Sequence, residues 1–249
     1  MTTLAPPASR TAVRAADLVK VHGSGGTAVR ALDGVDIALA HGGFTAVMGP
    51  SGSGKSTLLH CLAGLETPTS GEVWLGGTAL SSLSDRERTV LRRERVGFVF
   101  QSFNLLPTMT AEQNVLLPLQ LAGTRVDPAW FDGVVSSLGI ADRLHHRPSE
   151  LSGGQQQRVA VARALMTRPD VVFADEPTGN LDSAAGAEVL ALLRSSVDDL
   201  GQTVVMVTHD AAAASVADLV VLLADGRRAA TVDQPTPSSV LGALHLLEG

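Results

Sequence analysis

Apolar and polar residues alternate along residues 12–21 and 28–39, and the glycine-rich segment 23–26 lies between them. A period of two is typical of strands that bury one face, and clustered glycines favour a turn. The pattern therefore predicts two antiparallel strands joined by a glycine-rich turn. Residues 72–75 predict another short strand, which ends at two glycines.

Four other segments are apolar without alternation: residues 44–48, 96–100, 171–174 and 203–207. Continuous apolar runs of this length are typical of parallel strands that are buried on both faces. Each run leads into polar or glycine candidates, which in chain order are Gly49, Gln101, the pair Asp175 and Glu176, and His209. Ligands of open α/β sheets bind beyond the carboxyl ends of the strands, so we expect these residues to share one site.

Helical spacing predicts helices at residues 85–94, 155–166 and 183–200. Strand patterns are missing between 103 and about 165. We therefore expect a helical subdomain at about 102–166, inserted between core segments at about 12–101 and 167–233.

A last pair of strands is predicted around residues 219–223 and 228–233. The tail that follows, residues 234–249, has apolar residues at helical spacing. We expect it to form one amphipathic helix, whose apolar residues are Val240, Leu241, Leu244 and Leu247.

The composition narrows the classes of protein. The net charge of -6 and the pI near 5.6 provide no overall basic field that would draw the chain to nucleic acid. The single cysteine, Cys61, excludes an internal disulfide, and its place on an apolar helix face predicts burial. Arginines are frequent in residues 85–94, but acidic residues interleave with them, which favours a solvated helix face.

Membrane-spanning and targeting segments are not expected. A membrane helix needs about 18 or more consecutive apolar residues, and the best candidate, residues 203–223, contains His209, Asp210 and Asp218. Residues 1–10 contain two prolines and lack the apolar stretch of a signal peptide.

Residues 49–57, GPSGSGKST, fit the pattern G-x-x-x-x-G-K-[ST] between a predicted strand and an apolar helical segment. Its glycines let successive N–H groups point at an anion, and the helix that follows adds partial positive charge. Lys55 would contact the β- and γ-phosphates, and the Ser56 hydroxyl would hold Mg²⁺. The residues of this P-loop that we expect to bind nucleotide are Gly49, Ser51, Gly52, Ser53, Gly54, Lys55, Ser56 and Thr57.

Residues 151–155, LSGGQ, predict a second anion site. Ser152 and Gln155 fit a capping box at the start of a helix. Glycine costs about 1 kcal/mol relative to alanine inside a helix, so a purely structural helix would not favour two in its first turn. Gly153 and Gly154 leave backbone amides accessible at the positive end of the helix, where an anion is favoured.

Asp175 and Glu176 directly follow a predicted buried strand. A carboxylate at that position can bind Mg²⁺ together with Ser56. The next carboxylate, Glu176, can polarise the water that attacks the γ-phosphate. Acidic pairs at strand ends are common by themselves. Together with the P-loop, this pair is a strong indication of a nucleotide-hydrolysing site.

These motifs, in this order, resemble those of the ATP-binding subunits of ABC transporters over about residues 12–230. Residues 49–57 look like the Walker A loop, and LSGGQ looks like the signature motif. The other matching positions are Gln101 for the Q-loop, VVFADE at 171–176 for Walker B, Leu181-Asp182 for the D-loop and His209 for the switch histidine. Residues 97–107 and 175–182 resemble the branch that serves macrolide export, lipoprotein release and the cell-division regulator complex.

The resemblance implies an α/β fold with a P-loop NTPase (RecA-like) core, an antiparallel β subdomain and an inserted helical subdomain, all in one nucleotide-binding domain, residues 1–249. It implies ATP and Mg²⁺ as cofactors. The implied catalytic residues are Glu176, His209 and Gln101, and those at the metal are Ser56, Gln101 and Asp175. Ser152, Gly153, Gly154 and Gln155 would bind the nucleotide held by a partner subunit.

The implied partners are a second ATPase subunit, expected to form a head-to-tail homodimer on ATP binding, and a transmembrane permease in a separate chain. The protein would then lie peripherally on the inner face of the cell membrane, in the cytoplasm, and bind no nucleic acid. The apolar residues after Gln101, among them Phe103, Leu105 and Leu106, lie where a permease helix docks in this family. Alternatively, they seat the helical subdomain.

One position departs from the family pattern. The family usually stacks adenine on an aromatic residue, commonly a tyrosine, shortly after the first strand. This chain has no tyrosine, and His22 occupies the matching place. Because imidazole offers less stacking area, we expect weaker or less selective binding of the base.

Three alternatives to a transport ATPase remain open. A regulatory ABC ATPase would signal through a membrane partner to cell-wall hydrolases without transport. An ABC-type ATPase acting on DNA or ribosomes usually has coiled-coil arms or two ATPase modules, which this sequence lacks. A P-loop kinase would have no use for the LSGGQ helix.

Overall fold

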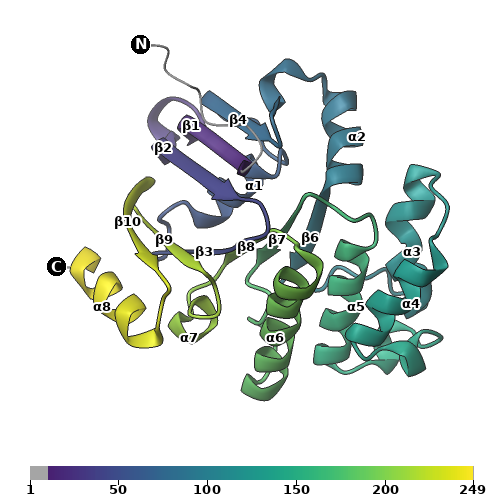
Figure 1. Ribbon diagram of the computed structural model, residues 1–249. Coiled ribbons are helices and arrows are strands. Elements are labelled where there is room, and N and C mark those ends of the chain that lie inside the picture. Colours follow the sequence, from purple (N-terminus) through teal and green to yellow (C-terminus); the bar gives the residue numbers. More distant parts are fainter. Residues whose placement is uncertain (1–10, 249) are drawn as a thin grey trace, which may run out of the picture.

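The computed structural model describes residues 11–248 and contains two sheets (Figure 1). The smaller sheet is antiparallel and consists of β1 (Thr11–His22), β2 (Val29–Ala40), β4 (Ser70–Leu75) and β5 (Thr78–Ala79). Its strand order is β2-β1-β4-β5, and the predicted glycine-rich turn contains a short 3-10 helix, Gly25–Thr27. The expectation that residues 1–10 hold no signal peptide lies outside the described residues.

The larger sheet has the order β10-β9-β3-β8-β7-β6. Its strands are β3 (Phe44–Met48), β6 (Val96–Phe100), β7 (Val171–Asp175), β8 (Val204–Val207), β9 (Leu219–Ala224) and β10 (Arg227–Asp233). All neighbouring pairs are parallel except β9 and β10. The four continuous apolar runs are therefore parallel neighbours, as their sequences predict.

The helices are α1 (Lys55–Leu62), α2 (Asp85–Arg95), α3 (Ala111–Ala122), α4 (Pro128–Ser137), α5 (Gly153–Leu165), α6 (Ser183–Leu200), α7 (Ala211–Ala214) and α8 (Pro237–Glu248). Helix α1 lies between the two sheets, where Leu58, Leu59 and Leu62 share one core with β1 and β2. A second core joins the other face of the large sheet to α5, α6 and α7. Helices α3 and α4 lie beside α5, at the end of the molecule far from α8 (Figure 1).

Several predicted boundaries differ slightly from the structure. Strand β4 begins at Ser70 rather than Glu72, because Ser70 already pairs with Val19 of β1. Helix α5 begins at Gly153, since Ser152 caps it through the predicted box with Gln155. Cys61 is buried, and burial raises the pKa of its thiol to about 11.

The tail forms helix α8, as expected, and three of its four expected apolar residues pack against the core. Val240 is fully buried, and Leu244 and Leu247 pack partly against the same core. Leu241 is 48% exposed. Residues 240, 244 and 247 share one helical face at spacings of four and three, and position 241 lies off it.

The two tryptophans lie in different parts of the fold. Trp74 is in β4, with the guanidinium of Arg14 4.5 Å from its ring centre. Trp130 is in α4, where Arg168 lies 4.7 Å from the ring and the indole N–H donates to the carbonyl of Leu165. No helix among residues 11–248 has the length and hydropathy needed to cross a bilayer.

Gly97 of β6 allows the sheet to approach α5 closely. A β-carbon at this position would lie 2.5 Å from the carbonyl oxygen of Ala164. We expect Gly97→Ala to force the two elements apart and to lower the free energy of unfolding by about 1–3 kcal/mol. Denaturant unfolding measures this change.

Gly133 of α4 is the matched control, because a β-carbon there would meet no atom within 4 Å. Gly133→Ala should raise the free energy of unfolding by about 0.5–1 kcal/mol, since alanine is the better helix former. An unchanged stability of Gly97→Ala would contradict the close approach of β6 and α5.

Candidate functional site

The P-loop joins β3 to α1 and depends on glycine at two close approaches. Gly49 has φ 148°, and a β-carbon there would lie 2.0 Å from the carbonyl oxygen of Leu223. Gly54 has φ 97°, and its β-carbon would lie 2.2 Å from the carbonyl oxygen of Ala31. Gly54 also provides no side-chain cap for α1, so the first amides of this helix suit an anionic ligand.

Lys55 is folded over the P-loop. Its ammonium donates to the carbonyl oxygens of Gly49 at 2.9 Å and Pro50 at 2.8 Å. Burial lowers the pKa of Lys55, while the nearby carboxylates of Glu176 and Asp175 oppose that shift. A phosphate group at the start of α1 would give this half-buried ammonium an anionic partner in place of the two carbonyls.

Ser56 and Asp175 meet, as the sequence predicts. The Ser56 hydroxyl donates to Oδ1 of Asp175 at 3.4 Å. Burial, the largest cause, and Glu176 raise the pKa of Asp175, whereas His60, Ser56 and Lys55 lower it. A hydroxyl beside a carboxylate is the kind of hard oxygen donor set that Mg²⁺ prefers, so these two residues fit the expected metal.

Glu176 and His209 form a second pair. Nδ1 of His209 lies 2.9 Å and 3.0 Å from the two carboxylate oxygens of Glu176. The side chain of His209 is 75% exposed, and that of Glu176 is 20% exposed. Glu176 has φ 47°, a strained backbone conformation for a residue with a β-carbon, and such strain is common at functional positions.

Gln101 lies at the same edge of the sheet but does not contact the Ser56 and Asp175 pair. The pairing of Phe100 with Asp175 puts Gln101 beside Glu176 along the edge. The Gln101 amide donates to the side chain of Asn180 at 3.2 Å. Its proposed role at the metal therefore stays a prediction.

The second candidate anion site lies apart from the P-loop. Ser152, Gly154 and Gln155 line a hollow of about 310 Å³, together with Gly139, Asp142, Arg143, Arg158, Ala185 and Glu188. No P-loop residue borders this hollow. The structure also supplies a packing reason for the glycines, because β-carbons at Gly153 and Gly154 would lie 3.2 Å from Leu181 and 3.1 Å from Ala185.

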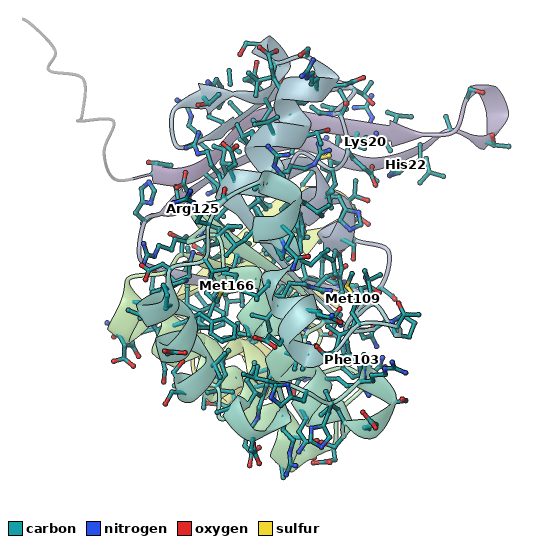
Figure 2. The ribbon with its side chains drawn as sticks, turned by 90° about the vertical axis from the view of Figure 1, so that its right-hand side faces the viewer. Lys20, His22, Phe103, Met109, Arg125 and Met166 are labelled. Atoms are coloured by element: carbon teal, nitrogen blue, oxygen red, sulfur yellow. The ribbon has the colours of Figure 1, made fainter. Side chains whose placement is uncertain are left out.

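His22 lies next to the P-loop, at the place where the base is expected. Its Nε2 is 3.4 Å from the Thr57 hydroxyl and 3.9 Å from a carboxylate oxygen of Glu66. The side chain is 45% exposed, so part of the ring is accessible to a ligand. Figure 2 shows His22 and Lys20 near the start of the hairpin that projects from the body.

His60 of α1 is a residue of the site that was not expected from the sequence. Its Nε2 lies 3.9 Å from Oδ2 of Asp175, and its Nδ1 lies 3.4 Å from Glu66. A signal was available, because His60 follows Ser56 by four residues and therefore shares its helix face. Asn180 and Gln157, which contact the segments around Gln101 and Glu176, were missed as well.

The chain is similar in sequence to proteins of a known family. Residues 32–179, more than half of the chain, match the family model described as ABC transporter. Over 209 residues the chain is 46% identical to the macrolide export ATP-binding/permease protein MacB of Bdellovibrio bacteriovorus, a match that covers 83% of this chain and 32% of that protein. It is 43% identical to the lipoprotein-releasing system ATP-binding protein LolD of Psychrobacter arcticus, covering 86% of this chain and 96% of the relative.

Among solved structures, the dimeric ATP-binding cassette MJ0796 bound to ADP and Pi superimposes with a TM-score of 0.81. It is 37% identical in sequence, and the match covers 90% of this chain and 99% of that one. The chain spans only about a third of MacB, so what MacB does as a whole is not carried over.

The largely parallel sheet and the P-loop at its edge define a protein with the P-loop NTPase fold. More narrowly, the chain belongs to the ABC transporter family, and it is an ATP-hydrolysing cassette.

Removing the charge of Asp175 should affect stability and ligand binding in opposite directions. A native pKa raised above 3.8 means that the folded state holds the proton more tightly than the unfolded chain. Stability therefore falls as the pH rises through the window from 3.8 to the raised value, and it stays reduced at pH 7. Asp175→Asn should raise the melting temperature of the nucleotide-free protein, by about 2–4 °C if the gain is about 1 kcal/mol.

The same variant should bind nucleotide more weakly when Mg²⁺ is present. Asp132→Asn, an exposed change on α4, is the control and should shift the melting temperature by less than about 2 °C. Thermal unfolding and nucleotide titration check both arms, and a lower melting temperature for Asp175→Asn would contradict the role of burial.

Proposed function

We propose that this chain is the ATP-binding and hydrolysing subunit of an ABC exporter of the MacB and LolD kind, which powers a permease in a separate transmembrane chain. The observation that carries the proposal is the 43–46% identity to relatives named for macrolide export and lipoprotein release, together with matching motifs. Substrates of those chemical classes, or peptides, would be extruded. The subunit would lie peripherally on the inner face of the cell membrane.

The proposed roles follow the contacts of the site. Lys55 and the first amides of α1 bind the phosphates, and Ser56 with Asp175 holds Mg²⁺, which neutralises charge on the phosphates when bound. Glu176 accepts a proton from the attacking water. His209, already 2.9 Å from Glu176, orients that carboxylate and contacts the water or the γ-phosphate.

We propose that two copies of the chain form the active state. The structural relative MJ0796 is described as dimeric, and its match covers nearly all of that chain. Ser152, Gly153, Gly154 and Gln155 would then face the γ-phosphate of the nucleotide on the partner subunit. The separate position of this second anion site supports the arrangement, since no P-loop residue of the same chain borders it.

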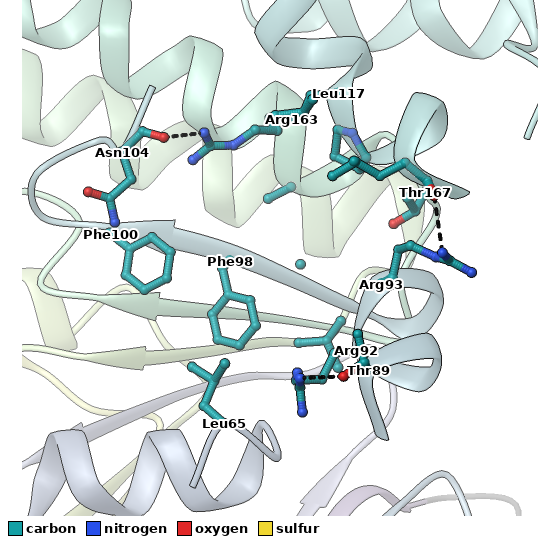
Figure 3. Close-up of a pocket in the computed structure, with 15 residues that line it drawn as sticks. Leu65, Thr89, Arg92, Arg93, Phe98, Phe100, Asn104, Leu117, Arg163 and Thr167 are labelled. Carbon is teal, nitrogen blue, oxygen red and sulfur yellow. Dashed lines mark hydrogen bonds between the residues drawn. The ribbon is translucent and has the colours of Figure 1, made fainter. Parts of the chain in front are cut away.

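A groove of about 430 Å³ lies between α2, β6, α3 and α5 (Figure 3). Phe98 and Phe100 of β6 form one wall, with their rings stacked 5.5 Å apart, and Leu117, Pro118 and Leu121 of α3 also line it. Three arginines border the groove: Arg92, Arg93 and Arg163. No acidic residue is among its described lining residues.

This groove fits a short permease helix with an apolar face and at least one acidic side chain. Phe100 of its wall directly precedes Gln101, so an occupant would press on the segment that enters the candidate site. In the segment after Gln101, Leu105 packs against the core. Leu106 is 41% exposed and remains a candidate contact for the permease.

Glu176→Gln tests the proposed base. Glutamine keeps the shape of the side chain but cannot take up the proton, so ATP turnover should fall by roughly 10²–10⁴-fold. ATP affinity should be retained, because the phosphates are bound by the P-loop. Steady-state hydrolysis and nucleotide titration measure the two quantities.

Lys55→Ala is the comparison, because it should weaken ATP binding itself. Turnover of the Glu176→Gln protein within twofold of the unchanged protein would remove Glu176 from the role of base.

Leu121→Asp tests the docking groove. Leu121 is 65% exposed on α3, so an aspartate there should leave the folding and basal hydrolysis of the isolated subunit intact. It should weaken binding to the permease, because a charge replaces an apolar contact and would repel the acidic side chain of the docked helix. Co-purification of the two chains is the measurement.

Leu246→Asp is the matched control, since Leu246 is 84% exposed on α8, away from the groove. If Leu121→Asp binds the permease as well as Leu246→Asp does, the permease docks elsewhere.

A further inference from the structure

Gln157 is a fully buried polar residue of α5 that belongs to none of the recognised motifs. Its amide nitrogen donates to the carbonyl oxygen of Phe100 at 3.3 Å and to that of Pro177. Phe100 is the residue before Gln101, and Pro177 is the residue after Glu176. One side chain therefore binds the backbone beside both candidate catalytic residues.

The chemistry of this contact requires a carboxamide. Two carbonyl oxygens face the side chain, and an NH₂ group has two hydrogens with which to bind them. Rotating the amide would put its oxygen against those carbonyls, so they fix the orientation. Oε1 is left buried with no hydrogen-bond partner among the described residues, an unfavourable state that an apolar side chain of the same size would avoid.

A second contact joins the same two segments nearer to the surface. The Gln101 side chain donates to Oδ1 of Asn180, and Nδ2 of Asn180 donates to the Gln101 carbonyl at 3.0 Å. Gly179 makes this approach possible, because a β-carbon there would lie 2.7 Å from the side-chain nitrogen Nε2 of Gln101. Asn180 therefore holds both the side chain and the backbone of Gln101.

The turn that carries Asn180 is itself tied to Glu176. The N–H of Gly179 donates to the carbonyl of Glu176 at 3.0 Å, and Glu176 is strained at φ 47°. Strained residues persist only where the surroundings hold them. The Gln157 bond to Pro177 provides such a constraint directly after Glu176.

We propose that Gln157 and Asn180 are positioning residues that join the segments after β6 and β7 into one unit. Gln157 fixes the segments from the core side and Asn180 from the solvent side, so that Gln101 and Glu176 keep a set separation. Gln157 lies on α5, the helix that begins at Gly153 and is capped by Ser152, so a movement of the signature segment shifts both candidate catalytic residues together. This inference rests on the proposed roles of Gln101 and Glu176.

Gln157→Met tests the buried contact, with Gln202→Met as the matched control. Gln202 is also buried, and its amide donates to two carbonyls, of Pro169 at 3.0 Å and Thr203 at 3.2 Å. It lies before β8, at the edge of the sheet opposite the candidate site. The two substitutions thus remove the same chemistry from two places.

The melting temperatures of both variants should fall by similar amounts. Only Gln157→Met should lose hydrolysis, with kcat lowered by about tenfold while KM for ATP changes by less than about twofold, since nucleotide binding depends on the P-loop. Equal kcat values for the two folded variants would overturn the proposal.

A double-mutant cycle at the surface tests the other contact and does not depend on a buried substitution. Asn180→Ala should lower kcat of the otherwise unchanged protein but not lower it further in a Gln101→Ala background, because Asn180 acts through Gln101. Asn180→Asp keeps the acceptor and loses the donor, so its kcat should lie between that of the unchanged protein and that of Asn180→Ala. Independent, multiplicative losses from Asn180→Ala and Gln101→Ala would overturn the role of Asn180.

Glu176→Gln distinguishes a failure of the proposed site function from a failure of the positioning role. If that variant hydrolyses ATP normally, the proposed function of the site fails. If it is inactive while Gln157→Met turns over like Gln202→Met, only the positioning role fails.

Discussion

The parallel pairing of β6, β7, β8 and β3 is the constraint on which the site depends. The register puts Phe100 opposite Asp175 and Asp175 opposite Val207, so the residues that follow each strand leave the sheet side by side. Strands β3, β7 and β8 are buried on both faces, and a shift of one residue would exchange their side chains between the two cores. The relative positions of Gln101 and Glu176 therefore follow from strand packing before any loop contact is made.

Local patterns were sufficient to predict the strand types, the P-loop, the capped start of α5 and the meeting of Ser56 with Asp175. These features depend on residues close in sequence, or on the general rule that parallel strands end at one edge. Gln157 and Asn180 could not be found this way, because their partners are carbonyls and amides from segments 20 to 79 residues away. The apolar character of Leu241 did not show whether it packs on the core, because that depends on its angle around the helix.

The candidate catalytic groups already have partners within the chain. Lys55 is bonded to P-loop carbonyls, Glu176 to His209, and Gln101 to Asn180. Binding of nucleotide must therefore exchange existing hydrogen bonds for new ones, and the net gain is smaller than the number of new contacts suggests. Such an exchange also makes each of these side chains sensitive to the state of its neighbour.

The separate placement of the two tryptophans gives the molecule two built-in optical probes. With no tyrosine in the chain, ultraviolet emission comes almost entirely from Trp74 in the antiparallel sheet and Trp130 in the helical region. Each indole lies against an arginine, whose charge influences the emission energy of the ring. Replacing one tryptophan by phenylalanine leaves a single emitter, so the movements of the two regions are recorded independently and without an attached dye.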